Sequence, residues 1–437
     1  MSGASFSLAA ADSRVAALFG THSAHARRHR ALLVAEGTIG GRPVAVAATD
    51  PGMQHGAIGI EEGRALAGLF ARARAAGAAV VLALDSAGAR VDEDLGALGA
   101  FRALFRAALD ARLAGVPMFA LLGRNCFGGA SLLACLCGQR SYLPQTLLAA
   151  SGPRVIEATE GAARFDARDV RVVSAHLGAP ARIAWHGQDR ERPDTLEAAT
   201  CSVHEWLMQS ADHAPDLARG QSALEARLAD RASDARGDAQ PGASLPESLL
   251  PAGYAPSYSG RLLQAYPEPG TRKPVFLGAL GGGPLDAAES VRLSWLLLGV
   301  RDAWPGSPIV LLLDASAHAA SVRDESVLLS DYLVHLSLVI AALARDGHRI
   351  VLWILGQASG ASYVAFSAPA HSVSAAVDAR IEILPSAARA AIVGTRAAPA
   401  TGTDAWLSSG VADALLDERL RFDPKHPTRQ QPGGTSA

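Results

Sequence analysis

Two glycine-rich turns, one in each half of the chain, carry the residues best suited to chemistry. The first contains Gly128 and Gly129, and the second contains Gly360 and Ala361. Each turn follows an apolar run typical of a buried strand and precedes a helix of small residues. Backbone N–H groups at a helix start attract negative charge. Two such groups that converge can stabilise an oxyanion, so both turns are candidate acyl-binding sites.

A second short turn precedes each glycine-rich turn. It reads Asp85-Ser86-Ala87-Gly88 in the first half and Asp314-Ala315-Ser316 in the second. Ala87 and Gly88 are predicted to complete one oxyanion site, because glycine lets a thioester carbonyl approach the backbone closely. Taken singly, each turn also fits a simple tight connection between strand and helix.

The elements that position these turns occur twice in the same order. A buried strand ends in Asp and small residues, and a long helix, a second strand, the glycine-rich turn and a small-residue helix follow. The predicted strands are 78–84, 118–122, 308–313 and 349–355, and the predicted long helices are 95–113 and 326–345. Apolar strands that alternate with helices indicate an α/β fold with parallel sheets.

The length of the chain fits two domains. It has 437 residues, and 49% of them are hydrophobic, which is enough for two cores. Residues 234–246 are polar and contain Gly, Pro and Ser, so they are predicted to be a linker. We therefore place a first domain at residues 1–243, with a helical extension, and a second at 244–437.

Composition argues against several classes of function. The 40 basic and 42 acidic residues give a net charge of −2, so we expect no nucleic-acid partner and no membrane surface. The four cysteines form no C-x-x-C pair, which argues against a metal site and favours a cytoplasmic location. The start of the chain lacks the pattern of a signal peptide, and no membrane span is predicted. The His/Arg-rich residues 21–30 are interpreted as a solvated arm.

Several separate motifs resemble the β subunit of biotin-independent malonate decarboxylase. The likeness runs from about Glu36 to Val170, and the second half resembles the γ subunit of the same enzyme, as if fused in one chain. The first-half motifs are Gly37–Pro43, Ala57–Gly59, Asp85–Val91, Asn125–Ser131, Gly152–Glu157 and Phe165–Asp169; the second-half motifs are Leu311–Ser316, Arg323–Glu325, Gly356–Ala361 and Pro385–Ile392.

The resemblance implies two tandem crotonase-like domains related to acetyl-CoA carboxylase carboxyltransferases. It implies decarboxylation of a malonyl thioester to the acetyl thioester, through an enolate that an oxyanion hole stabilises. The substrate would be carried on the CoA-like prosthetic arm of an acyl-carrier protein, with no tightly bound cofactor and no metal. A separate α subunit that transfers malonate and a higher oligomer are the other implied partners.

Roles for individual residues follow from the turns and the resemblance. The predicted catalytic residues are Ala87, Gly88, Gly128, Gly129, Gly360 and Ala361, and the predicted substrate-binding residues are Arg90, Gly152, Glu157 and Ser316. Arg90 is assigned to a phosphate of the arm, with a surface salt bridge as the alternative. Glu157 either shapes the substrate wall or serves as a charge at a helix N-terminus. His55 stands where the family has glycine and is expected to narrow the cleft.

Three functions remain open at this point. The first is the malonyl thioester decarboxylase, and the second is a biotin-dependent acyl-CoA carboxyltransferase that uses the same enolate chemistry. The third is a non-catalytic paralogue that serves as a scaffold. Cys126, just before the first glycine-rich turn, is interpreted as a buried structural thiol.

Overall fold

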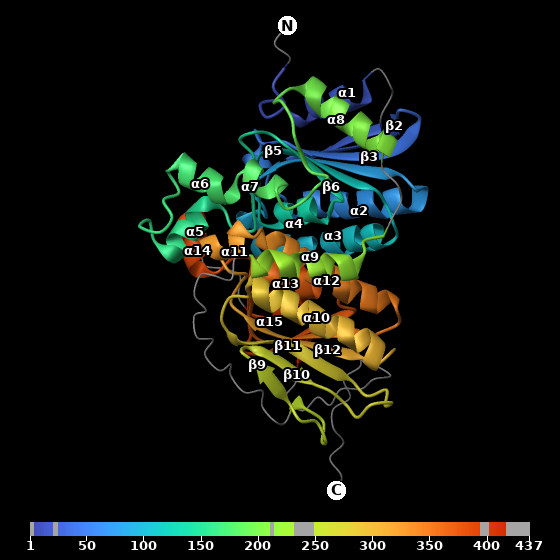
Figure 1. Cartoon of the computed structure of the whole chain (residues 1–437), viewed down its shortest axis with the longest axis vertical. Coiled ribbons are helices and arrows are strands. Elements are labelled where there is room, and N and C mark those ends of the chain that lie inside the picture. Colours follow the sequence, from blue (N-terminus) through green and yellow to red (C-terminus); the bar gives the residue numbers. More distant parts are fainter. Residues whose placement is uncertain (1–3, 21–24, 210–213, 231–248, 394–401, 417–437) are drawn as a thin grey trace.

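The computed structural model describes residues 4–20, 25–209, 214–230, 249–393 and 402–416. Two mixed α/β halves stack so that their helices face each other and their sheets lie outside (Figure 1). The predicted boundary at 243/244 and the predicted linker at 234–246 fall within 231–248, outside the described residues.

The first half is built on one sheet whose described strands follow the order β1-β2-β3-β4-β5-β6-β8, with β7 beside β5. Its strands are β1 (His25–His29), β2 (Leu32–Ile39), β3 (Arg42–Thr49), β4 (Ala79–Ser86), β5 (Met118–Phe127), β6 (Gln139–Tyr142), β7 (Leu147–Ala149) and β8 (Arg190–Glu191). Its inner helices are α2 (Ile60–Ala76), α3 (Asp94–Leu113) and α4 (Gly129–Leu136), and α5 (Pro153–Glu160), α6 (Val170–Leu177) and α7 (Ala179–Ile183) follow.

The second half repeats this plan strand for strand. Its sheet runs β16-β14-β13-β12-β11-β10-β9, with β15 beside β13. Its strands are β9 (Ser257–Ser259), β10 (Leu262–Ala265), β11 (Val275–Gly282), β12 (Ile309–Ala315), β13 (Ile350–Ser359), β14 (Ser372–Ala376), β15 (Arg380–Glu382) and β16 (Ala414–Leu416); its helices are α10 (Ala287–Ala303), α11 (Val322–Ser326), α12 (Leu329–Arg345), α13 (Gly360–Ser367), α14 (Ser386–Val393) and α15 (Thr403–Ser409). The predicted internal repeat thus has a structural counterpart.

Asp85 and Asp314, the equivalent aspartates of the two strand-end turns, have a structural role. The strand pair β4–β5 and the pair β12–β13 each shift register near this residue. The Asp85 carboxylate accepts the N–H groups of Arg124 and Asn125 at 3.0 and 3.2 Å, and Asp314 accepts Gln357 N–H at 2.7 Å. These bonds carry the second strand past the predicted end at residue 122, so that β5 continues to Phe127.

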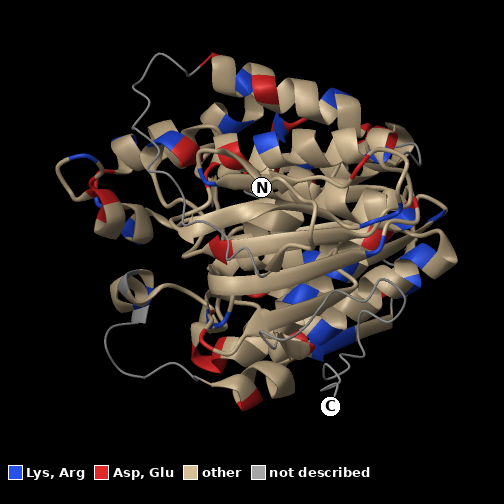
Figure 2. Cartoon of the chain, turned by 90° about the horizontal axis from the view of Figure 1, so that it is seen from below, with Lys and Arg blue, Asp and Glu red and all other residues tan. Residues whose placement is uncertain are grey.

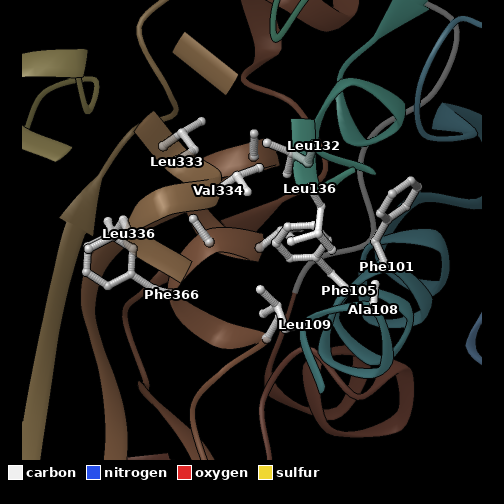
Figure 3. Close-up of a cluster of buried hydrophobic side chains, with 14 of the residues drawn as sticks. Phe101, Phe105, Ala108, Leu109, Leu132, Leu136, Leu333, Val334, Leu336 and Phe366 are labelled. Atoms are coloured by element: carbon white, nitrogen blue, oxygen red, sulfur yellow. The ribbon is translucent and has the colours of Figure 1, made fainter. Parts of the chain in front are cut away.

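Apolar side chains join the two helical layers into one core. α4 packs against α12, and α13 packs against α3, which is the reciprocal pattern of a two-fold-related pair. One buried hydrophobic cluster contains side chains from all four helices: Phe101 and Phe105 of α3, Leu132 of α4, Leu333 of α12 and Phe366 of α13 (Figure 3). Because the cluster spans both halves, neither half buries its helices alone.

A helix from the first half crosses to the second. α9 (Leu217–Ala229) packs against α10 and α12. Arg227 of α9 donates to Asp331 of α12 at 2.8 Å, and Asp331 also accepts from Arg140 at 3.2 Å and His186 at 2.7 Å. Burial raises the pKa of the Asp331 carboxyl, but its interactions with His186, Arg140 and Arg227 outweigh this effect and hold the pKa well below its usual range. A buried ion network therefore fixes the halves relative to each other.

The outer surface carries one helix, α1 (Ala11–Phe19), and one strand, β1, that the sequence did not predict, together with a second helix, α8 (Leu196–Gln209), that belongs to the predicted helical extension. The two helices cover the outer face of the first sheet (Figure 1). The predicted solvated arm is in part a strand, because His25–His29 form β1 and pair antiparallel with β2. Basic and acidic residues are interspersed over the view in Figure 2. None of the described helices is both long and apolar enough to cross a membrane.

Because the halves share one core, a large-to-small change there should destabilise both together. Phe105→Ala is expected to lower the unfolding free energy by about 3–5 kcal/mol through loss of burial and the cavity left behind. Asp110→Ala, on the exposed side of the same helix, is the control and should change stability by less than about 1 kcal/mol. Denaturant unfolding followed by far-UV circular dichroism should show one transition for each variant. Two separate transitions would contradict a shared core.

Candidate active site between the halves

One cavity of about 930 Å³ lies between the halves and is lined by both glycine-rich turns. The first half contributes Ala87, Gly128, Gly129 and Gly152, and the second contributes Ser316, Gly360 and Ala361. Most of the other lining residues are apolar, with a few polar groups among them, as in many small-molecule sites. The fold therefore brings together nearly all the residues that the sequence singled out.

Each glycine-rich turn contains one glycine with a positive φ. Gly128 has φ of 56° and Gly360 has φ of 55°, a region that side chains rarely adopt. α4 starts at Gly129 and α13 starts at Gly360. Within the described chain, neither the Gly129 N–H nor the Ala361 N–H has a hydrogen-bond acceptor. N–H groups at a helix start point away from the helix body, so both are available to a ligand.

The turn at Ala87 and Gly88 serves the cavity differently from the prediction. The Ala87 N–H donates to the His55 carbonyl at 3.0 Å, and the Gly88 N–H donates to Ser86 Oγ at 3.1 Å. Both groups are therefore already bonded within the protein. Gly88 is needed for space instead, because a Cβ there would lie 2.9 Å from the Phe127 carbonyl oxygen. His55 lines the cavity, as expected.

Arg90 lies at the cavity, but its charge is already paired. The side chain is 2% exposed and donates to Glu62 at 2.6 Å and Glu93 at 2.8 Å. The alternative of a salt bridge is thus found, although the bridge is buried and not on the surface. Arg154, at the start of α5, also lines the cavity and is exposed, with no acidic partner in the described chain. Arg154 is therefore better placed than Arg90 to bind an anionic ligand.

Of the remaining predicted substrate-binding residues, two line the cavity and one does not. Gly152 lines the cavity as the N-cap residue of α5, and Ser316 lines it with an N–H that donates to Gly282 and Gly283, at 3.2 Å each. Glu157 does not line the cavity and lies in the middle of α5. Its carboxylate accepts the Ala167 N–H at 2.7 Å, so it fixes a loop residue that does line the cavity.

Sequence reasoning missed a polar cluster at one end of the cavity. Ser151 and His318 both line it, and Ser151 Oγ lies 3.1 Å from His318 Nε2. Glu325 of α11 accepts the N–H groups of Ala150 and Ser151 at 3.2 and 2.6 Å. His318 lies two residues beyond Ser316, but Ser151 comes from the other half. No local pattern links these residues.

Burial changes the acid–base behaviour of this cluster. It lowers the pKa of His318 to about 4, with a smaller opposing effect from the Ala150 carbonyl, so the imidazole is neutral at pH 7. Burial raises the pKa of Glu325 to about 7, although Arg182 and the two N–H donors act in the opposite direction. The pKa of the buried Cys126 thiol is raised well above its usual range, which fits a structural thiol.

The described residues contain no group of three or more His, Cys, Asp or Glu side chains able to hold a metal ion. The polar groups that line the cavity are mostly backbone amides, hydroxyls, imidazoles, guanidinium groups and the side-chain amide of Gln54, beside the carboxylate of Asp92. Such a set suits the binding of acyl and carboxylate oxygens.

Comparison with known proteins finds a match to one domain family within the first half of the chain. Residues 10–179 match the carboxyl transferase domain family. Over 130 residues the chain is 32% identical to the acetyl-coenzyme A carboxylase carboxyl transferase subunit beta of Dinoroseobacter shibae; the match covers 30% of this chain and 41% of that protein. Over 166 residues it is 26% identical to the methylmalonyl-CoA carboxyltransferase 12S subunit of Propionibacterium freudenreichii, covering 38% of this chain and 31% of that one.

The solved structures that the chain matches include a Pseudomonas malonate decarboxylase hetero-tetramer in complex with malonate. It is 25% identical and covers 54% of this chain and 95% of the matched chain, with a TM-score of 0.49. A transcarboxylase 12S structure is 20% identical and covers 94% of this chain and 87% of that one, with a TM-score of 0.42. The chain matches less than half the length of each of the curated relatives named above.

The raised pKa of Glu325 makes stability depend on pH in a defined direction. The folded carboxyl holds its proton up to about pH 7, whereas an unfolded glutamate loses it near its ordinary pKa of 4.5. The folded state is therefore favoured at low pH, and that advantage is lost as the pH rises through 7. The difference corresponds to roughly 3 kcal/mol.

Glu325→Gln removes this titration. The unfolding free energy of wild type minus that of the variant should fall by up to about 3 kcal/mol between pH 5 and pH 8. Urea unfolding at several pH values measures it, with Glu197→Gln on the exposed side of α8 as the control for the isosteric change. A difference that stays constant with pH would show that Glu325 ionises normally in the folded protein.

Proposed function

We propose that this chain decarboxylates a malonyl-type thioester, with the reaction in the cavity between the halves. The observation that carries the proposal is that the Gly129 and Ala361 turns, from opposite halves, line one cavity. The carboxyl transferase domain at residues 10–179 supports the same class of chemistry. Enzymes of this kind form or consume an enolate, which needs hydrogen-bond donors at the thioester oxygen.

The chemistry follows from where the N–H donors lie. Loss of CO2 leaves negative charge on the thioester oxygen as the enolate forms. An N–H donor from one turn stabilises that oxygen, and the donor from the other turn holds the carboxylate end. Both donors are fixed before the substrate arrives, because each belongs to the first turn of a packed helix. The mostly apolar lining is a poor environment for a carboxylate group, which favours its loss as CO2.

The substrate arm has a matching set of groups. A CoA-like prosthetic arm is long, partly apolar and anionic at its phosphate. The cavity volume of about 930 Å³ lies within the range of ligand sites and accommodates the acyl end. Arg154 at its edge is placed to meet an anion, a role first assigned to Arg90. Delivery on an acyl-carrier protein, with a separate malonate-transferring subunit and a higher oligomer, belongs to the same proposal.

A biotin-dependent acyl-CoA carboxyltransferase is the second candidate. Two observations favour it. Residues 10–179 match the carboxyl transferase domain family, and the two curated relatives named above are carboxyl transferase subunits. Both candidates use one enolate and the same N–H donors. They differ in the fate of the carboxyl group, which leaves as CO2 in one case and passes to biotin in the other.

Release of CO2 from malonyl-CoA without biotin separates the two candidates. The purified chain is incubated with carboxyl-labelled malonyl-CoA as a mimic of the loaded carrier, and the released CO2 and the acetyl-CoA formed are quantified. The decarboxylase proposal expects both in equal amounts with no biotin present. Turnover only after addition of a biotin acceptor would favour the carboxyltransferase.

A pair of glycine variants tests whether the turns act in catalysis. Gly360→Ala places a methyl group on a backbone with φ of 55° and within 3.4 Å of the His318 ring. The expected loss of CO2 release is ~10²–10³-fold, the usual effect of losing one oxyanion donor. Gly347→Ala is the matched control, since Gly347 has φ of 92° with open space around it. Both variants should lose about 1 kcal/mol of stability, but Gly347→Ala should keep its activity.

A further inference from the structure

The two ends of the cavity occupy equivalent places in the repeat but differ in chemistry. The isolated bridges Ile58–Ala89 and Leu285–His318 make His318 the counterpart of Ala89. The registers of β7 on β5 and β15 on β13 make Ser151 the counterpart of Leu384. One end thus has a histidine and a serine where the other has an alanine and a leucine, and all four line the cavity.

At the polar end the imidazole is enclosed and incompletely bonded. His318 is 7% exposed, and its Nδ1 has no hydrogen-bond partner in the described chain. The ring edge with Nδ1 faces Gly360, because a Cβ on that glycine would lie 3.4 Å from Nδ1. The imidazole therefore lies beside the turn that presents the Ala361 N–H. An acyl oxygen held by that N–H would place the neighbouring carbon near His318 and Ser151.

The bonding pattern favours one tautomer of His318. A buried N–H without an acceptor is rarer in proteins than a buried lone pair without a donor. Since Nδ1 has no partner, the proton is better placed on Nε2, which then donates to Ser151 Oγ at 3.1 Å. Ser151 Oγ accepts that bond, so its own O–H is left to point elsewhere. No other acceptor for this hydroxyl lies within the described residues.

We propose that Ser151 and His318 together deliver the proton that the enolate carbon takes up after CO2 has left. This inference rests on the proposed decarboxylase function and names its acid. Ser151 is the group that touches the substrate carbon, and His318 acts through Ser151 as a positioning and relay residue.

The proton transfer conserves both atoms and charge. The electron pair of the enolate forms a C–H bond with the Ser151 hydroxyl proton, and the O–H bond breaks. The serine oxygen regains a proton from His318 Nε2–H, and the imidazole regains one from water that enters as CO2 leaves. The negative charge of the malonyl carboxylate ends on hydroxide in solvent. A neutral imidazole is a competent donor here, because an enolate carbon is a strong base.

A purely structural explanation is that the Ser151–His318 bond only ties the halves together. The chain offers a matched case: His176 Nδ1 of α6 lies 2.9 Å from Ser326 Oγ of α11. This pair also joins the two halves, but neither residue lines the cavity. Removing it controls for the loss of a cross-half His–Ser contact.

Exchange of the α-protons of acetyl-CoA in D2O measures the proton step without decarboxylation. Wild-type protein should exchange them, and both His318→Ala and Ser151→Ala should reduce exchange and CO2 release by ~10²–10⁴-fold, the usual contribution of a general acid. His176→Ala should stay close to wild type in both assays. Added imidazole should restore part of the exchange in His318→Ala, which a merely structural role would not produce.

The outcomes separate the two proposals. If wild type releases CO2 but His318→Ala and Ser151→Ala exchange protons as fast as wild type, the acid is another group and the inference is wrong. If wild type neither releases CO2 nor exchanges protons, the decarboxylase function itself fails. Should His318→Ala not fold, His318→Gln and Ser151→Ala decide the question, because the first keeps an N–H donor but cannot relay a proton.

Discussion

The packing of α3 and α4 against α12 and α13 is the constraint on which the site depends. These helices share one apolar core, so neither glycine-rich turn can move without disturbing both halves. The turns stand at the starts of α4 and α13, and the core therefore sets the distance between the two sets of N–H groups. The ion network around Asp331 also joins the two halves. It restricts how they can shift relative to each other, because breaking a buried ion pair is strongly destabilising.

The repeat explains why one cavity has donors from both sides. Two equivalent turns, each with a glycine at φ near 55°, line the same cavity beside a reciprocal helix contact. A malonyl thioester, with a carbonyl oxygen at one end of the acyl group and a carboxylate at the other, fits such a pair of donors. The repeat also makes the departures from symmetry informative. His318 and Ser151 break it at one end only, and that end is where we place the proton transfer.

Much of the fold was readable in the sequence because it depends on local patterns. Apolar runs located the central strands, helical periodicity located α3 and α12, and the Asp-small-small turns revealed the repeat. The cavity residues Gly128, Gly129, Gly360 and Ala361 followed from their place after a buried strand. The extension of β5 to Phe127 did not, because it depends on hydrogen bonds to the Asp85 carboxylate from residues some 40 positions away.

The site was less predictable wherever long-range contacts decide. Arg90 has the right type for a phosphate, yet two glutamates that the sequence does not single out already pair with it. The amide groups of Ala87 and Gly88 are taken by neighbours that only the folded chain brings close. Ser151 contacts His318 and Glu325 across the two halves, and no spacing rule links it to residues more than 160 positions away.

A crystal structure with a non-hydrolysable malonyl-CoA analogue tests the central claim most directly. We expect the acyl group in the cavity between the halves, with one oxygen within hydrogen-bonding distance of the Gly129 or Ala361 N–H and the α-carbon beside Ser151. An analogue bound elsewhere, or one whose oxygens contact neither N–H group, would contradict that claim.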